Sequence, residues 1–131
     1  MSIDVKPFLM FQGRAEEAIR FYVETLPDTE LIQLDRYGPD GSGAEGTVSM
    51  AVVRIGGLTL MANDSPPIHD FSFTPSLSLF VTCRSEDELE RLACALSQGG
   101  SFLMPPDTYG FSQRFAWVSD RFGVSWQLNL P

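Results

Sequence analysis

Positive charge is scarce in this chain. Lys6 is the single lysine among nine basic residues, which face 17 acidic ones, and the formal net charge is −8. The arginines are scattered rather than aligned in a basic stripe, which argues against nucleic acid and anionic membranes as partners. The sequence also lacks a run of roughly 18 apolar residues and the basic-then-apolar pattern of a secretory signal. We therefore expect a cytoplasmic protein with no membrane partner.

Cysteine and histidine are equally scarce. Cys83 and Cys94 are the two cysteines, too few for a disulfide framework, so reduced thiols are expected. Free cysteines mostly behave as small apolar residues rather than as nucleophiles. The single histidine, His69, lies in a loop with Asp64 and Asp70 nearby. Most loop histidines are solvated, so we favour that interpretation over metal binding.

Phenylalanine, by contrast, is abundant, with ten residues among 131. A chain of this length is most simply one domain, large enough to bury a core without disulfides or a structural metal. The phenylalanines either fill that core, which is their usual place, or line an apolar cavity. Composition alone leaves both interpretations open.

Two segments have the pattern of amphipathic helices. Residues 15–26 carry apolar side chains at a 3.6-residue period, and Pro27 stops the segment. The second helix begins at a capping box, Ser85 to Glu88, and ends at the pair Gly99 and Gly100. Each helix follows a short apolar strand, at 7–11 or 77–81. Three further strand-like segments follow each helix, at 30–37, 48–55 and 58–62 and then at 101–104, 114–118 and 124–130.

The order of elements is therefore β-α-β-β-β twice, an internal repeat of roughly 60 residues. We predict an α+β fold in which two βαβββ modules form a curved eight-stranded sheet with the helices on the outer face. The whole chain, 1–131, is expected to be one domain with modules at about 1–65 and 75–131. The competing ferredoxin-like dimer has the order β-α-β-β-α-β, and three consecutive strands after each helix argue against it.

Two glycine-containing hairpins support the repeat. Asp120 and Gly123 lie between two apolar strands and predict a tight hairpin. Gly56 and Gly57 stand at the same place in the first half. The remaining glycine-rich passage, 41–46, lies between two predicted strands rather than between a strand and a helix.

The chain resembles a known group of proteins at several stretches: 7–11, 15–18 with 21–22, 71–75, 103–105 and 120–128. Paired βαβββ modules are typical of the vicinal oxygen chelate superfamily, which contains glyoxalase, bleomycin-resistance and dioxygenase proteins. Within it the chain looks like the PhnB-like branch, often labelled a 3-demethylubiquinone-9 3-methyltransferase domain. The residues do not support methyl transfer, because a Rossmann-type site requires a glycine-rich turn between a strand and a helix.

The resemblance implies a divalent metal held by four side chains, one from the first and last strand of each module. Alignment of the repeat places these positions at Pro7, Met61, Ser76 and Gln127. Proline and methionine supply no ligand for a hard divalent ion. A slip of one residue does not restore the site, because it brings in Phe8, Leu60, Leu77 and Trp126. We therefore expect no metal and no other cofactor.

The same fold implies a cavity on the concave face of the sheet. By strand parity and position we predict a ligand pocket lined by Leu9, Phe11, Met61, Ser78, Phe80, Phe115, Trp117 and Gln127. The alternative is that these side chains meet and close the core. Arg114 either guards the mouth of the pocket, beside Asp107 and Tyr109, or is a solvated surface residue.

The function predicted from the sequence is a metal-free small-molecule-binding protein for an apolar or aromatic ligand. The resemblance implies that it forms a homodimer. The alternative is a divalent-metal-dependent lyase, isomerase or dioxygenase of the same superfamily. Metal-free acid–base catalysis is a third hypothesis, but no pair of carboxylates is placed for it. Whether the protein is an enzyme therefore stays open at this stage.

Overall fold

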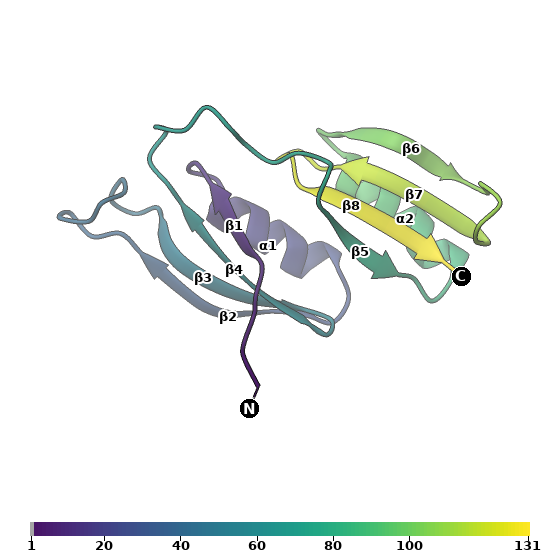
Figure 1. Ribbon diagram of the computed structural model, residues 1–131, viewed down its shortest axis with the longest axis horizontal. Coiled ribbons are helices and arrows are strands. Elements are labelled where there is room, and N and C mark those ends of the chain that lie inside the picture. Colours follow the sequence, from purple (N-terminus) through teal and green to yellow (C-terminus); the bar gives the residue numbers. More distant parts are fainter. Residues whose placement is uncertain (1) are drawn as a thin grey trace. The chain divides into compact units, whose positions relative to one another are not determined.

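The computed structural model describes residues 2–131, and the chain divides into two compact units, Met1–Ser72 and Phe73–Pro131 (Figure 1). Each unit contains one strand, one helix and three further strands in chain order, so the two predicted βαβββ modules are confirmed. The strands of the described chain form two four-stranded sheets rather than one continuous sheet of eight. None of the described helices is long and apolar enough to cross a lipid bilayer.

The first unit is a mixed sheet covered by one helix. The sheet order is β1-β4-β3-β2, with β1 parallel to β4 and the other pairs antiparallel. Helix α1 packs against β2, β3 and β4 through its buried residues Ala18, Ile19 and Tyr22. The bounds are β1 Phe8–Phe11, α1 Ala15–Thr25, β2 Thr29–Arg36, β3 Val48–Ile55 and β4 Leu58–Asp64.

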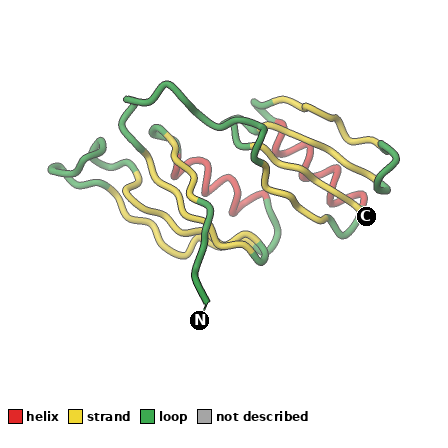
Figure 2. The backbone as a smooth tube through the Cα atoms, viewed as in Figure 1, coloured by secondary structure: helices red, strands yellow, loops and turns green. Residues whose placement is uncertain are grey.

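The second unit repeats this arrangement, as the tube in Figure 2 shows. Its sheet order is β5-β8-β7-β6, and α2 packs against β6, β7 and β8. Strand β6 extends three residues beyond the predicted 101–104, through Pro105 and Pro106. Prolines are tolerated there because β6 is an edge strand, where a missing N–H leaves no ladder partner unpaired. The bounds are β5 Ser78–Thr82, α2 Glu86–Ser97, β6 Ser101–Asp107, β7 Arg114–Ser119 and β8 Ser125–Leu130.

The N-terminus of α1 is capped by Asp64, the last residue of β4 in the sheet that α1 covers. Arg14, at the N-cap position, makes no side-chain capping bond. Instead the carboxylate of Asp64, at the end of β4, accepts hydrogen bonds from the backbone N–H groups of Gly13 at 2.7 Å, Ala15 at 3.0 Å and Val48 at 2.9 Å. Asp64 is only 2% exposed. Its charge therefore stabilises the positive end of the helix and joins α1 to β3 and β4.

The closing hairpin is organised by a second buried carboxylate, Asp120. The N–H of Gly123 donates to the carbonyl of Asp120 at 2.9 Å, and Gly123 adopts a φ of 91°, so the predicted tight turn is confirmed. The Asp120 side chain accepts from the backbone N–H groups of Phe122 and Val124 and from the indole N–H of Trp126. The turn residue thus holds the largest fully buried side chain of the second unit in place.

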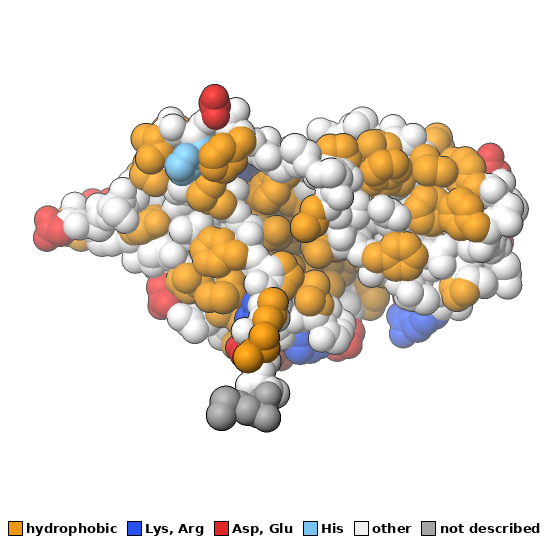
Figure 3. Space-filling model, viewed as in Figure 1, with side chains coloured by type: hydrophobic (Ala, Val, Ile, Leu, Met, Phe, Trp, Pro, Cys, Tyr) orange, Lys and Arg blue, Asp and Glu red, His pale blue; other side chains and the backbone are white. Residues whose placement is uncertain are grey.

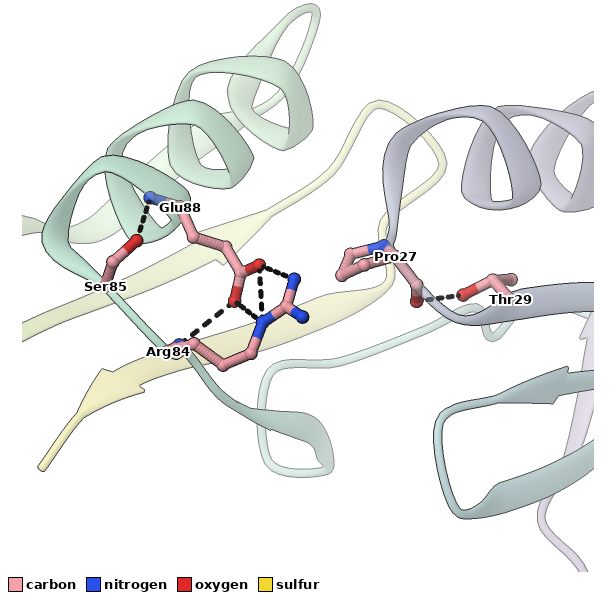
Figure 4. Close-up of polar contacts among 5 residues, drawn as sticks. All are labelled: Pro27, Thr29, Arg84, Ser85 and Glu88. Atoms are coloured by element: carbon pink, nitrogen blue, oxygen red, sulfur yellow. Dashed lines mark hydrogen bonds and ion pairs between the residues drawn. The ribbon is translucent and has the colours of Figure 1, made fainter.

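The capping box of α2 forms, with one difference from the usual pattern (Figure 4). The N–H of Glu88 donates to the hydroxyl of Ser85 at 3.1 Å. The Glu88 carboxylate accepts from the backbone N–H of Arg84 at 3.0 Å, not from that of Ser85, and also pairs with the Arg84 guanidinium. These bonds to Arg84 lower the pKa of Glu88. The same figure shows the connection between α1 and β2, where the Thr29 hydroxyl donates to the carbonyl of Pro27.

Replacing Glu88 by glutamine is expected to weaken the acid dependence of folding. A carboxyl whose pKa is lowered by folding contributes stability above its unfolded pKa of about 4.3, and the contribution disappears as pH falls through the folded pKa. Urea unfolding should therefore show E88Q about 1 kcal/mol less stable than the native protein at pH 7 and nearly equal to it at the acid limit. Parallel pH profiles of the two proteins would contradict this assignment.

Candidate functional site

The second sheet has one face covered by α2 and one face without a helix. Buried side chains of β7 and β8 line the covered face, among them Ala116, Val118, Trp126 and Leu128. Because alternate residues of a strand point to opposite faces, the intervening residues line the other side. We call this side the open face of the second sheet; it consists of Ser78, Phe80 and Thr82 from β5, Phe115, Trp117 and Ser119 from β7, and Ser125, Gln127 and Asn129 from β8.

Five of the eight predicted pocket residues lie on this open face. Gln127 pairs with Phe80 on one side and with Trp117 on the other, and Ser78 and Phe115 lie on the same face. Figure 3 shows hydrophobic side chains gathered over the second sheet on the side that faces the viewer. The structure therefore brings together the polar and aromatic residues that strand parity assigned to one surface.

The other three predicted pocket residues do not share a face, so that part of the prediction is wrong. In the parallel ladder of the first sheet Met61 pairs with Phe8, whereas Leu9 pairs with Ala62. Leu9 and Phe11 are buried on the side of α1, and Met61 lies on the opposite side. The register between β1 and β4 decides this, since a shift of one residue exchanges the two faces.

A hydrogen-bonded network of neutral groups runs across the open face. The indole N–H of Trp117 donates to the Ser125 hydroxyl at 2.8 Å, and the hydroxyls of Ser125 and Ser78 lie 2.7 Å apart. The side-chain amide of Gln127 donates to Ser78 at 3.3 Å. Ser125 was absent from the predicted pocket, although its spacing of two residues from Gln127 places it on the same face. The network fixes Trp117 and Gln127 through groups that carry no charge themselves.

The aromatic residues beside this network differ in exposure. Phe115 is 5% exposed and lies edge-on to Phe111 and Tyr109, at ring-centroid distances of 5.0 and 6.3 Å. Phe80 is 59% exposed. Of the two sequence interpretations, core filling thus fits Phe115, while Phe80 presents apolar surface. The exposure of Trp117 is intermediate between those of Phe115 and Phe80, so this side chain is partly accessible.

The residues at the four predicted metal positions do not fit a divalent ion. Pro7 and Ser76 precede β1 and β5, so the side chains beside Met61 and Gln127 are in fact Phe8 and Phe80. Phe8, Met61, Phe80 and Gln127 together offer one amide and no carboxylate or imidazole. Among the described residues no group of three or more His, Cys, Asp and Glu is placed to hold a metal.

Three other groups that the sequence singled out, Cys83, Arg114 and His69, have defined local surroundings. Burial raises the pKa of the Cys83 thiol to about 11, and the Glu88 carboxylate adds to the rise, so the thiol is protonated at neutral pH. Arg114 faces α2, where its guanidinium donates to Glu90 at 2.6 Å, and therefore does not guard the open face. His69 stacks on Phe71, with ring centroids 4.8 Å apart.

Comparisons with known proteins agree with this fold. The model of a family described as 3-demethylubiquinone-9 3-methyltransferase matches residues 3–129. The solved structure of a PhnB protein from Bacillus cereus, given the same family description, is 43% identical, covers 98% of this chain and 100% of its own, and has a TM-score of 0.93. Protein PA1353 from Pseudomonas aeruginosa is 30% identical, with 98% of both chains covered and a TM-score of 0.85. A glyoxylase/bleomycin resistance protein/dioxygenase domain from Frankia sp. EAN1pec is 18% identical over 99% of this chain and 92% of its own, and its TM-score of 0.68 shows a shared fold.

Proposed function

The chain belongs to the 3-demethylubiquinone-9 3-methyltransferase family, whose members share the glyoxalase-like fold, and we propose that it binds an apolar or aromatic small molecule without a metal. The observation that carries the proposal is the open face of the second sheet. There, a partly exposed indole and an exposed Phe80 flank a fixed row of neutral hydrogen-bonding groups. Apolar walls with a few oriented polar groups are typical of small-molecule sites.

Methyl transfer, the reaction in the family's description, finds no supporting site. The glycine-rich passage 41–46 joins β2 to β3, where the N–H of Gly46 donates to the carbonyl of Tyr37. A methyl-donor site of the Rossmann type needs such a passage between a strand and a helix. The proposal is therefore binding, not methyl transfer.

Ligand binding is expected to quench the fluorescence of Trp117. Of the two tryptophans, Trp126 is fully buried and Trp117 is partly exposed on the open face. Small aromatic and antibiotic-like compounds that raise the melting temperature should also quench this emission. In W117F the quenching should disappear, while Trp126 continues to report that the protein is folded. The proposal fails if no compound in a broad set shifts the melting temperature.

Elemental analysis separates this proposal from a metal-dependent lyase, isomerase or dioxygenase. The protein should be purified without chelator, and we expect less than about 0.1 equivalent of Zn, Ni, Mn or Fe per chain, because four suitable donors are missing from the expected positions. Stoichiometric metal would replace the binding proposal by the enzymatic one.

We also propose that the protein is a homodimer. Large apolar side chains of the second unit outside the proposed ligand site are exposed, including Leu77 and Phe111 at 65 and 62%. Exposed large apolar side chains are expected where a partner covers the surface. Light scattering at micromolar concentration should give twice the chain mass of 14.5 kDa. A particle of the single-chain mass would rule the dimer out.

A further inference from the structure

Two asparagines carry a side-chain carbonyl oxygen without a partner. Within the described chain, the Oδ1 atoms of Asn63 and Asn129 are buried and accept no hydrogen bond. Leaving a buried acceptor unpaired costs about 1–3 kcal/mol, and native proteins keep few such groups. Each of these oxygens is therefore a candidate for a bond that a ligand completes.

The two asparagines occupy equivalent positions in the repeat. Asn63 lies two residues after Met61 in β4, and Asn129 lies two residues after Gln127 in β8. In each unit the asparagine pairs with the parallel first strand, at Met10 or Thr82. The unpaired oxygen thus recurs in both copies of the module, which makes it a property of the module rather than an irregularity of one strand.

The surroundings of Asn129 define the chemistry that its oxygen would meet. Asn129 lies on the open face of the second sheet, across from Phe115 on β7. Along the same strand, Gln127 commits an amide N–H to Ser78, which leaves the carbonyl end of that amide as an acceptor. Two side-chain acceptors thus follow each other on β8 beside aromatic rings.

The open face also excludes one class of ligand. None of these nine residues of β5, β7 and β8 carries a charge, and Asp107 of β6, which pairs with Phe115, adds a carboxylate beside them. The surface therefore offers no cation to a phosphate, phosphonate or carboxylate. Burying such an anion without a partner costs far more than a hydrogen bond returns. The ligand that fits is uncharged, flat enough to lie on the aromatic side chains, and supplied with hydrogen-bond donors.

We propose that Asn129 is a specificity-determining residue, whose Oδ1 accepts a hydrogen bond from an N–H or O–H group of an uncharged aromatic ligand. The inference rests on the proposed binding function and deepens it by naming the ligand class. Because the oxygen is covered in this structure, a neighbouring group must move before a ligand can reach it.

Matched pairs of compounds test the assignment directly. Indole and 1-methylindole differ in a single donor, as do 2-naphthol and 2-methoxynaphthalene, and titration calorimetry gives the dissociation constant of each. We expect the native protein to bind the donor-bearing member about tenfold more tightly, which corresponds to about 1.4 kcal/mol for one hydrogen bond. In N129L, where an apolar side chain of similar size replaces the acceptor, the two members should bind equally.

Stability measurements and a matched variant separate recognition from a structural role. N129L removes an unpaired buried acceptor, so its melting temperature should equal or exceed that of the native protein. N63L makes the same change in the first unit, and it should keep the tenfold preference. Loss of the preference in both variants, or its persistence in N129L, would overturn the assignment to Asn129.

The outcomes for the native protein distinguish the two levels of the proposal. If the native protein binds both members of each pair equally, the role of Asn129 is wrong and the binding function stands. If it binds neither member of any pair, and the thermal-shift screen also finds no ligand, the proposed small-molecule binding is wrong.

Discussion

Replacing Asp64 by alanine is expected to lower the free energy of unfolding by about 4 kcal/mol. The substitution removes three hydrogen bonds from backbone N–H groups to one buried carboxylate, those of Gly13, Ala15 and Val48. A bond to a charged group contributes about 1.5–3 kcal/mol, and bonds that share an acceptor do not add fully. Since a domain is stable by only about 5–15 kcal/mol, the loss is a large fraction of the total.

Urea unfolding with hydrogen exchange measures this effect and locates it. The amides of Gly13, Ala15 and Val48 should lose protection before the rest of the first unit. Asp64→Asn should fall between the native protein and D64A, because its amide keeps one acceptor oxygen but presents N–H groups in place of the other. Asp40→Ala, at an exposed loop position, serves as the control and should change stability by less than about 0.5 kcal/mol. A loss below about 1 kcal/mol in D64A would show that Asp64 is not the cap of α1.

Replacing Gly100 by alanine is expected to cost about 3 kcal/mol, because the added methyl group meets backbone that has no room to move. A Cβ at this position would lie 2.1 Å from the carbonyl oxygen of Ser119 and 2.8 Å from the carbonyl carbon of Asp120. Overpacking of this kind typically costs about 1–3 kcal/mol, and contact with backbone places this case at the upper end. Ser119 ends β7 and Asp120 is the first residue of the closing hairpin's turn. Because Asp120 also accepts from the indole of Trp126, the near-ultraviolet signal of Trp126 should change as well.

Gly38→Ala is the matched control for this steric argument. A Cβ at Gly38 meets no atom within 4 Å, and the residue does not adopt a positive φ. Its replacement should therefore leave the urea midpoint within experimental error or raise it slightly, because alanine restricts the unfolded chain more than glycine does. Equal destabilisation by the two substitutions would show that the approach of residues 119 and 120 is not the cause of the loss in G100A.

Most of the local structure follows from the sequence. Helix α2 starts after Ser85, as the capping box predicts, and β3 has the predicted bounds of 48–55. The hairpin at Asp120 and Gly123 also forms where the turn residues place it. These features depend on interactions among residues a few positions apart. The end of β6 was not predictable in this way, because prolines are accepted in a strand only when it is known to lie at a sheet edge.

The candidate site was also predictable within single strands but not between strands. Parity along single strands grouped Phe115 with Trp117, and the tertiary structure confirmed that they share a face. Parity between strands depends on register, which local pattern does not fix for a strand of four residues such as β1. Leu9 and Phe11 were therefore assigned to the wrong face, and the neighbours of Met61 and Gln127 became visible only in the paired strands.

The sequence by itself determined the repeat of βαβββ modules and the helix and turn signals, because residue type and short-range periodicity carry that information. The tertiary structure alone decided how those elements pair. It brought Asp64 to the start of α1 from 49 residues away in the chain, joined Trp117 and Ser78 through Ser125, and left the oxygens of Asn63 and Asn129 unpaired. Contacts between distant segments form only when backbone register is set, and a single strand's pattern does not contain its register.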